Sequence, residues 1–293
     1  MRSKPGKRSS PPPGLKNISY ESPRPGTRRF QGMSVYVFDK NLGDRELRRL
    51  RMIEVARDPS SIQLLRRTGI QTGWKCLEIG PGAGSMLGWI GKKVGKSGLV
   101  IGVDKKPVYL RKFSTPPYDI RDGDFLQVEI DRPLDLVYGR YFLIHNRNTM
   151  EYIKKLHGLL RSGGYAVLEE PDFTSAKLLD NHSNTSQHRV NSAICKMFVD
   201  YGLDPAYGLR LPQNLRTAGF QIVEIHSTIH LCEGESPIAN LMAESALVLN
   251  QEYQKTGQAT AEDIQQYVAN AHDREYWSVY YSSISVIARA GTP

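Results

Sequence analysis

A glycine-rich loop behind a short apolar run is the feature that most constrains the fold of this chain. Residues 76–79, Cys-Leu-Glu-Ile, predict a buried strand, and glycines at positions 80, 82 and 84 predict a tight turn after it. A helical pattern follows at 86–94. Strand, glycine-rich turn and helix in this order form the ligand-binding unit of open α/β sheets, where the ligand lies beyond the carboxyl end of the strand. The sequence therefore predicts a doubly wound α/β fold.

The next predicted strand, residues 99–103, ends in Asp104. A carboxylate at this place can accept hydrogen bonds from both hydroxyls of a ribose. The dinucleotide fingerprint G-x-G-x-x-G would need glycine at position 85, where this chain has Ser85. The third glycine comes one residue early, and an acid, Glu78, stands two residues before the first. The loop is therefore not the dinucleotide fingerprint.

The pattern E-x-G-x-G-x-G over 78–84, with Asp104 at the next strand end, resembles the class I S-adenosylmethionine (SAM)-dependent methyltransferases. The segment L-L-R-S-G-G-Y-A-V-L-E-E at 159–170 is similar to the L-K-P-G-G type of segment in these enzymes. Gly202-Leu203-Asp204-Pro205 and Arg210-Leu211-Pro212 resemble a subgroup that methylates small-molecule metabolites. The resemblance implies a seven-stranded, mostly parallel sheet with helical N-terminal and lid additions, and SAM as the cofactor.

The resemblance also assigns cofactor-binding residues, all near the carboxyl ends of the first four strands. An acid after the third strand receives the adenine amino group in the family, and the next apolar residue lies against the adenine ring. Asp124 and Phe125 fit these two roles, and a helix cap is the alternative reading of Asp124. The full set is Glu78, Gly80, Pro81, Gly82, Gly84, Asp104, Lys105, Asp124, Phe125, Gly139 and Arg140.

Methyl transfer from SAM is an in-line displacement, so few catalytic groups are expected. His145 follows the fourth strand and is the candidate base for a hydroxyl acceptor; its loss should then lower turnover about 10²–10⁴-fold. A histidine packed under the next helix is the alternative. Glu169, Glu170 and Asp172 close the fifth strand and are candidates to bind the acceptor, or else a helix cap or a solvated charge. The predicted substrate-binding residues are Tyr36, Phe38, Tyr141, His145 and Glu170.

The chain divides into three predicted parts. Residues 1–29, rich in proline, serine and basic residues, predict a disordered tail, and residues 30–70 predict a helical cover over the substrate pocket. Residues 71–293 form the predicted SAM-binding domain, with lid insertions at about 172–213 and 234–276. In the cover, a helix from Asp44 and a second helix restarting at Asp58 are expected. The first should turn Leu47, Leu50, Ile53 and Val55 inward and Arg45, Arg48 and Arg49 outward.

The charge and the cysteine content of the chain limit which binding partners and which cellular location are expected. The formal net charge is +9, but residues 1–29 hold eight basic residues and one acid, so the rest of the chain carries only +2. This argues against a nucleic-acid-binding face. No apolar run is long enough to cross a membrane. The three cysteines, Cys76, Cys195 and Cys232, are far apart, so neither a disulfide framework nor a zinc site is indicated and a reducing, cytoplasmic location is expected.

The sequence thus predicts a methyltransferase that acts on an oxygen or nitrogen of a small-molecule metabolite. Two alternatives stay open: an RNA or protein methyltransferase tethered by the basic tail, and a SAM-binding protein that transfers no methyl group. The motifs G-x-S-x-G, H-E-x-x-H and G-K-[ST] are absent from the sequence, so hydrolase, zinc-protease and P-loop chemistry have no support. The acceptor and the oligomeric state do not follow from the sequence.

Overall fold

The structure is a computed structural model, which describes residues 36, 38, 43–131, 133–178 and 185–291. These residues all belong to one compact unit, 33–293. The predicted basic tail lies outside the described residues. The helices are α1 (Asp44–Arg67), α2 (Ser85–Val94), α3 (Thr149–Leu159), α4 (Ser186–Asp200), α5 (Tyr207–Thr217), α6 (Pro237–Val248), α7 (Asn250–Lys255) and α8 (Ala261–Ala271), with 3-10 turns η2 (Leu143–His145) and η3 (Phe173–Ser175).

The strands are β1 (Lys75–Ile79), β2 (Leu99–Asp104), β3 (Tyr118–Asp122), β4 (Leu134–Arg140), β5 (Leu160–Asp172), β6 (Lys177–Leu178), β7 (Phe220–Glu233) and β8 (Trp277–Ala290). In the described part of the chain they form a single sheet in the order β3-β2-β1-β4-β5-β8, with β7 along β8. β1 to β5 are parallel, and β8 runs antiparallel to β5 and β7. The predicted seven-stranded, mostly parallel sheet is confirmed, and β6 adds two residues to it.

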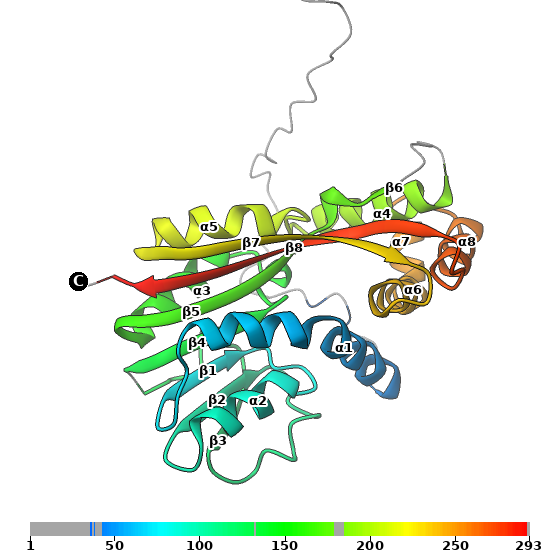
Figure 1. Ribbon diagram of the computed structural model, residues 1–293. Coiled ribbons are helices and arrows are strands. Elements are labelled where there is room, and N and C mark those ends of the chain that lie inside the picture. Colours follow the sequence, from blue (N-terminus) through cyan, green and yellow to red (C-terminus); the bar gives the residue numbers. More distant parts are fainter. Residues whose placement is uncertain (1–35, 37, 39–42, 132, 179–184, 292–293) are drawn as a thin grey trace, which may run out of the picture. The chain divides into compact units, whose positions relative to one another are not determined.

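Helices cover both faces of the sheet (Figure 1). α1 and α2 lie on one face, where Leu65, Ile90 and Val100 belong to one buried cluster. α3 and α5 lie on the other face, where Ile153, Leu211 and other apolar residues form the larger core. This three-layer arrangement places the carboxyl ends of β1, β2, β4 and β5 at one edge, which is where open α/β sheets bind ligands.

The cover differs from its prediction in two ways. First, α1 is one continuous helix with Pro59 inside it rather than two helices. A proline lacks only one N–H, and the buried side chains of Arg57 and Ser61 hold the helix in place on either side of it. Second, Val55 is 67% exposed, whereas Arg49 is buried. The predicted inward and outward sides of this helix were therefore wrong at both positions, since the buried Arg49 is paired with Glu46 of the same helix.

The insertions stand beyond the carboxyl end of β5. Residues 234–276 connect β7 to β8 and contain α6, α7 and α8, while η3, β6 and α4 lie between β5 and α5. In Figure 1 these helices gather at the end of the sheet where β8 begins. Because Asp172, the last residue of β5, pairs with Ser282 near that end, the insertions and α1 border the same edge.

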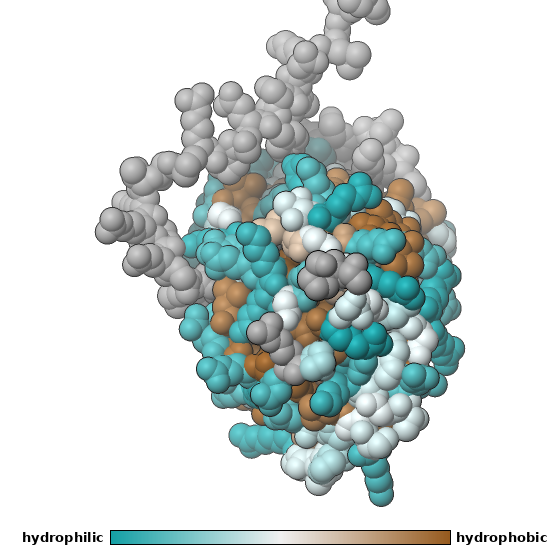
Figure 2. All heavy atoms as spheres, turned by 90° about the vertical axis from the view of Figure 1, so that its left-hand side faces the viewer, coloured by the Kyte–Doolittle hydropathy of each residue, from teal (hydrophilic) through white to brown (hydrophobic). Residues whose placement is uncertain are grey.

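The opposite side of the molecule has a mixed surface. Figure 2 looks onto the side where β8 ends, and its hydrophobic residues lie in separate patches among hydrophilic ones. None of the described helices is long and apolar enough to span a membrane.

Candidate active site

The glycine-rich loop forms a close-fitting turn between β1 and α2. Gly80, Gly82 and Gly84 all have positive φ, at +62°, +57° and +89°. A Cβ on Gly80 would lie 2.7 Å from the ring of Phe142, and one on Gly82 would lie 3.3 Å from Leu50. Glycine is therefore required both by the backbone conformation and by the crowding around the loop.

The acid at the end of β2 lies beside this loop. The Asp104 carboxylate accepts the amide hydrogen of Lys106 at 2.8 Å, and the Gly82 amide also hydrogen-bonds to it. Burial raises the pKa of Asp104, and these two amides act in the opposite direction. The structure thus brings together two features that the sequence separates by more than twenty residues.

Asp124 and Lys105 pair with each other. Lys105 Nζ lies 2.7 Å from Asp124 Oδ2, and the Leu126 amide donates to Asp124 Oδ1 at 3.0 Å. Burial alone would raise the pKa of Asp124, but Lys105 and the Leu126 amide lower it overall. Asp124 therefore caps a turn after β3, where the alternative prediction had a helix, and part of its side chain stays exposed.

Glu78 is buried at the end of β1, and its Oε2 has no hydrogen-bond partner. Burial raises its pKa well above the ordinary value, although Arg140 opposes this. Arg140, at the end of β4, makes a 2.9 Å ion pair with Asp58 of α1 and donates to Ser61. A buried polar atom without a partner is costly, so Glu78 Oε2 marks a place for a bound polar group.

Two predicted cofactor residues are used elsewhere. Phe125 is only 1% exposed and packs near Tyr152. A Cβ on Gly139 would lie 2.7 Å from Ile79 of the neighbouring strand, so this glycine serves strand packing. Both residues therefore have packing roles in this structure, and their contacts with the cofactor stay predictions. Pro81 lies in the loop, buried between two of the glycines.

The remaining residues fit SAM. The left-handed glycine turn, the Asp104 carboxylate and the unpartnered Glu78 oxygen converge at the carboxyl edge of β1 and β2. The glycine turn would lie against the cofactor, and the Asp104 carboxylate would accept hydrogen bonds from its ribose. The Glu78 oxygen would bind a polar group at one end of the cofactor. When bound, SAM supplies a methyl group already activated by its sulfonium.

The acids that close β5 have structural partners. Glu170 accepts the amide hydrogens of Phe142, Leu143 and Ile144 at 3.1, 2.8 and 3.0 Å and is fully buried. Burial raises the pKa of Glu170 to about 8, against the effect of these amides. Asp172 caps η3 through the Thr174 amide. Glu170 therefore holds the backbone beside the site and Asp172 has the capping role given as the alternative, while their binding of an acceptor stays a prediction.

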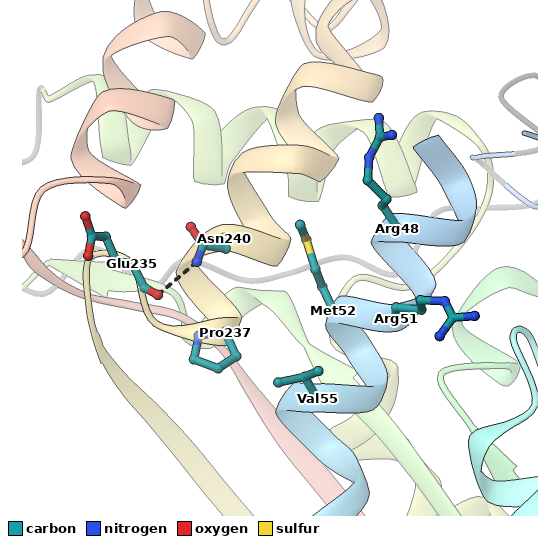
Figure 3. A pocket seen from close by; sticks show the side chains of 7 residues that line it. All are labelled: Arg48, Arg51, Met52, Val55, Glu235, Pro237 and Asn240. Atoms are coloured by element: carbon teal, nitrogen blue, oxygen red, sulfur yellow. Dashed lines mark hydrogen bonds between the residues drawn. The ribbon is translucent and has the colours of Figure 1, made fainter. Parts of the chain in front are cut away.

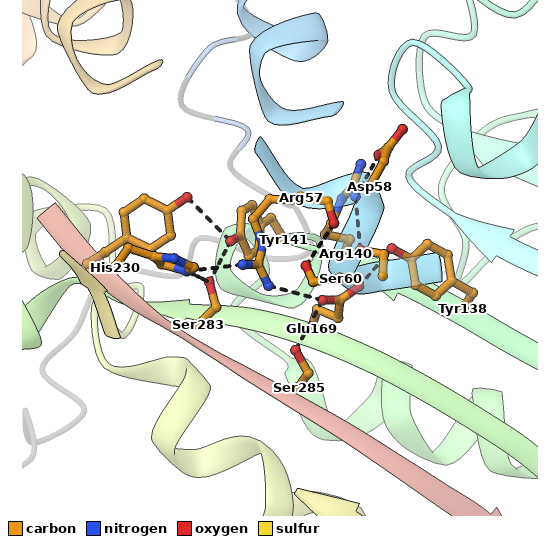
Figure 4. A network of polar contacts seen from close by, with 12 residues as sticks. Arg57, Asp58, Ser60, Tyr138, Arg140, Tyr141, Glu169, His230, Ser283 and Ser285 are labelled. Carbon is orange, nitrogen blue, oxygen red and sulfur yellow. Dashed lines mark hydrogen bonds and ion pairs between the residues drawn. The ribbon is translucent and has the colours of Figure 1, made fainter. Parts of the chain in front are cut away.

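Glu169 lies at the centre of a buried polar network (Figure 4). It accepts hydrogen bonds from Tyr138, Arg57 and Ser285 at 2.9, 3.3 and 3.1 Å. Its side chain points toward α1, whereas the neighbouring Glu170 points toward the turn after β4, as strand alternation requires. Three donors occupy its two oxygens, so Glu169 is a network residue rather than a free acid.

Tyr141, the first residue after β4, joins the same network. It has a φ of +54°, a strained conformation for a residue with a side chain. Its hydroxyl lies 2.7 Å from Ser283 Oγ, which lies 3.0 Å from His230 Nε2. A strained residue at the end of β4 is consistent with the predicted place of Tyr141 at the methyl-donor edge.

His145 lies half-buried between the rings of Tyr36 and Phe198, at 5.1 and 6.2 Å. Burial and the nearby Arg49 lower its pKa to about 3, and its Nδ1 has no partner. This pKa lies well below the neutral range that the sequence led us to expect. An imidazole with so low a pKa is a weak base, so the structure argues against the predicted catalytic role.

The two aromatic residues of the N-terminal segment reach the same region. The Tyr36 hydroxyl donates to Glu46 and accepts from Arg49 at 2.7 Å. The Arg49 guanidinium lies 3.6 Å from the centre of the Phe38 ring, which is buried. Tyr36 is half-buried beside His145, whereas Phe38 is buried and packs under Arg49.

Sequence reasoning missed Arg57 and His230, which meet although they are 173 residues apart. It also missed the buried pair of Glu46 and Arg49. Nothing in the amphipathic pattern of α1 indicates these roles, because buried charges look like surface charges in a sequence. Residues 46, 49 and 57 do lie on one side of the helix, but their spacing alone does not distinguish a buried side from an exposed one.

A separate groove lies between α1 and α6. It encloses about 330 Å³ and is lined by residues from both helices and the turn before α6, namely Arg48, Arg51, Met52, Val55, Glu235, Pro237 and Asn240 (Figure 3). Met52 and Val55 point toward α6, and Asn240 donates to the Glu235 carbonyl. None of the predicted site residues lines this groove.

Solved structures show the same fold. The 4+2 cyclase SpnF has a TM-score of 0.53 at 16% identity, covering 80% of this chain and 82% of the cyclase. A protein from Galdieria sulphuraria, provisionally named a sarcosine dimethylglycine methyltransferase, has a TM-score of 0.52 at 14% identity, with 82% and 88% covered. At such low identity these likenesses show the fold alone.

Sequence comparisons give the family. An uncharacterized 37.1 kDa protein in transposon TN4556 of Streptomyces fradiae is 28% identical over 135 residues, 44% of this chain. The match spans only 39% of the length of that relative. A family model described as a methyltransferase domain matches residues 44–207, more than half of the chain and the part that carries the glycine-rich loop and the ends of β1 to β5. The chain therefore belongs to the methyltransferase domain family.

Proposed function

We propose that this methyltransferase transfers the methyl group of SAM to an oxygen or nitrogen of a small-molecule acceptor. The observation that carries the proposal is a continuous series of rings beside the end of β4, which we call the aromatic chain. It runs from Tyr36 through His145, Phe198 and Phe173 to Tyr281. Neighbouring ring centres are 5.1 to 6.2 Å apart.

The aromatic chain draws its members from five different segments: the N-terminal segment, the turn after β4, α4, η3 and β8. Small-molecule sites are lined mainly by hydrophobic and aromatic side chains with a few polar groups among them. Here the polar groups are the hydroxyl of Tyr141 and the side chains of Arg57 and His230. A site bordered by insertions on several sides suits a compact acceptor better than a polymer.

The low net charge of the chain beyond the tail points the same way. Only +2 of the formal charge lies outside residues 1–29, and a polyanion would need a basic surface. RNA binding through the tail would lose affinity steeply with added salt.

The test is a screen of small hydroxyl and amine compounds with isotopically labelled SAM, with transfer of label and formation of S-adenosylhomocysteine as readouts. Transfer to a small acceptor supports the proposal. Transfer only to RNA or protein from an extract would contradict it. Binding of SAM without any transfer would favour a SAM-binding protein of another function.

A further inference from the structure

Arg57 of α1 is a buried arginine with an unused donor. Its side chain is 4% exposed, and Nη2 lies 3.3 Å from Glu169 while Nη1 lies 3.1 Å from His230 Nε2. Its Nε is buried and has no hydrogen-bond partner. Figure 4 shows the guanidinium beside Tyr141 and above the strand ends. A buried N–H without a partner is costly, and a bound acceptor group would remove that cost.

The guanidinium lies at the edge from which methyl transfer is expected. Glu169, its ion-pair partner, is aligned with Arg140, the last residue of β4. Tyr141 follows Arg140 and is linked through Ser283 to His230, the other partner of Arg57. Arg57 is thus held among side chains of β4, β5, β7 and β8, all at the end of the sheet that the aromatic chain borders.

The side chains around Arg57 are poorly suited to remove a proton from an acceptor. His230 Nε2 faces an arginine N–H and must be unprotonated, and burial together with Arg57 lowers its pKa to about 4. The pKa of His145 is about 3, through burial and Arg49. The other groups that face Arg57 are the acid Glu169, the cation Arg140 and the hydroxyls of Tyr141 and Tyr281. Glu169 is already bonded to three donors, and burial raises the pKa of Tyr281.

We propose that the acceptor is a planar aromatic compound whose nucleophilic oxygen arrives already ionised, an acidic phenol, and that the Nε–H of Arg57 binds this oxyanion. This inference rests on the proposed function and names its substrate class. The oxyanion lone pair forms the new C–O bond while the C–S bond breaks and leaves its electron pair on sulfur. No proton has to be removed, and the negative charge of the oxyanion and the positive charge of the sulfonium are both neutralised by the transfer. The arginine binds the anion, and the aromatic chain receives the ring.

The first experiment measures binding and needs no turnover. The protein is saturated with S-adenosylhomocysteine, and the ionisation of bound 4-nitrophenol is followed by absorbance across pH. We expect the bound phenol to ionise at least about one pH unit below the free phenol, a roughly tenfold shift toward the anion. A bound phenol that ionises at or above its free pKa would overturn the proposal. So would absence of phenol binding while S-adenosylhomocysteine binds; failure of S-adenosylhomocysteine to bind would instead overturn the proposed function.

Variants assign the effect to Arg57. Arg57→Lys keeps the charge but removes Nε and should lose most of the shift, and Arg57→Gln should lose all of it. Because Arg57→Gln leaves Glu169 without its cation and could unfold, the lysine variant carries the test. Arg67→Gln is the matched control, since Arg67 is a half-exposed arginine of the same helix that pairs with Glu224. An unchanged shift in Arg57→Lys would overturn the role of Arg57.

The second experiment compares two phenols of different acidity by their kcat/KM values across pH. If the oxyanion is the reacting form, each profile should rise about tenfold per pH unit and level off at the ionisation of that phenol. A bend at the same pH for both would show that an enzyme group removes the proton. Faster transfer to an aromatic amine than to either phenol would also contradict the proposal.

Discussion

Removal of the Glu170 carboxylate should destabilise the protein more than removal of a surface acid. Glu170 is fully buried and accepts three consecutive backbone amides, those of Phe142, Leu143 and Ile144. No side chain of η2 itself caps this turn, so a strand far away in the sequence supplies the cap. The carboxylate thereby holds the backbone between Tyr141 and His145.

The magnitude follows from the amides left without a partner. Each buried donor that loses its acceptor costs about 1–3 kcal/mol. Part of this is offset, because burying the carboxyl group is itself unfavourable and raises the pKa of Glu170 to about 8. We therefore expect Glu170→Ala to lower the free energy of unfolding by about 3–5 kcal/mol. Glu170→Gln keeps one acceptor oxygen but turns an amide toward a backbone N–H, so about 1–3 kcal/mol is expected.

Urea unfolding followed by circular dichroism provides the measurement. The control is Glu244→Ala, because Glu244 makes a single ion pair with the half-exposed Arg45 and should change stability by less than about 1 kcal/mol. If Glu170→Ala unfolds at the same urea concentration as the control, the three amides do not depend on this carboxylate and the reasoning is wrong.

Three further predictions concern the cofactor, the tail and His145. Asp104→Ala should weaken SAM binding by about 1.5–3 kcal/mol in calorimetry, and unchanged affinity in a folded variant would contradict its role. Deleting residues 1–29 should leave SAM affinity and Tm nearly unchanged, and a large fall in Tm would show that the tail packs on the domain. The lowered pKa of His145 means that the unfolded chain binds a proton more readily, so stability is lost as pH falls below about 6.5. Between pH 7 and 5 this loss of stability should reach about 2 kcal/mol, and it should be absent in His145→Gln. The turnover of His145→Gln at pH 7 to 8 should stay within about tenfold of the wild-type value. A fall in turnover of about 10²-fold or more would instead show that His145 acts as the base.

Local patterns predicted the part of the fold on which the cofactor site depends. The strand 75–79, the glycine turn and Asp104 were recognisable because each is defined by a few neighbouring residues. The lengths of β7 and β8 were not. Each of these two strands has 14 residues. They pair with each other along nearly their whole length, and the paired residues lie 44 to 70 positions apart in the sequence.

The acceptor side was harder to predict because its charges are buried in pairs. A sequence pattern assigns arginine and glutamate to the outside of a helix, and it assigned Arg49 there. Burial of Arg49 and Arg57 requires Glu46 and Glu169, and Glu169 belongs to a strand 112 residues beyond Arg57. Glu170 shows the same limit. Its position at a strand end suggested ligand binding, whereas in the structure its oxygens accept hydrogen bonds from three backbone amides.

α1 connects the two halves of the site. Its Glu54 accepts the Ser85 amide at the start of α2, its Asp58 pairs with Arg140 at the end of β4, and its Arg57 pairs with Glu169 on β5. The first contact fills a helix N-terminus that could otherwise bind an anion, so α1 neutralises that end from within the protein. The third leaves Arg57 Nε buried and without a hydrogen-bond partner. One helix therefore borders both the glycine-rich loop and the proposed oxyanion site, which makes it a structural part of both sites rather than only a cover.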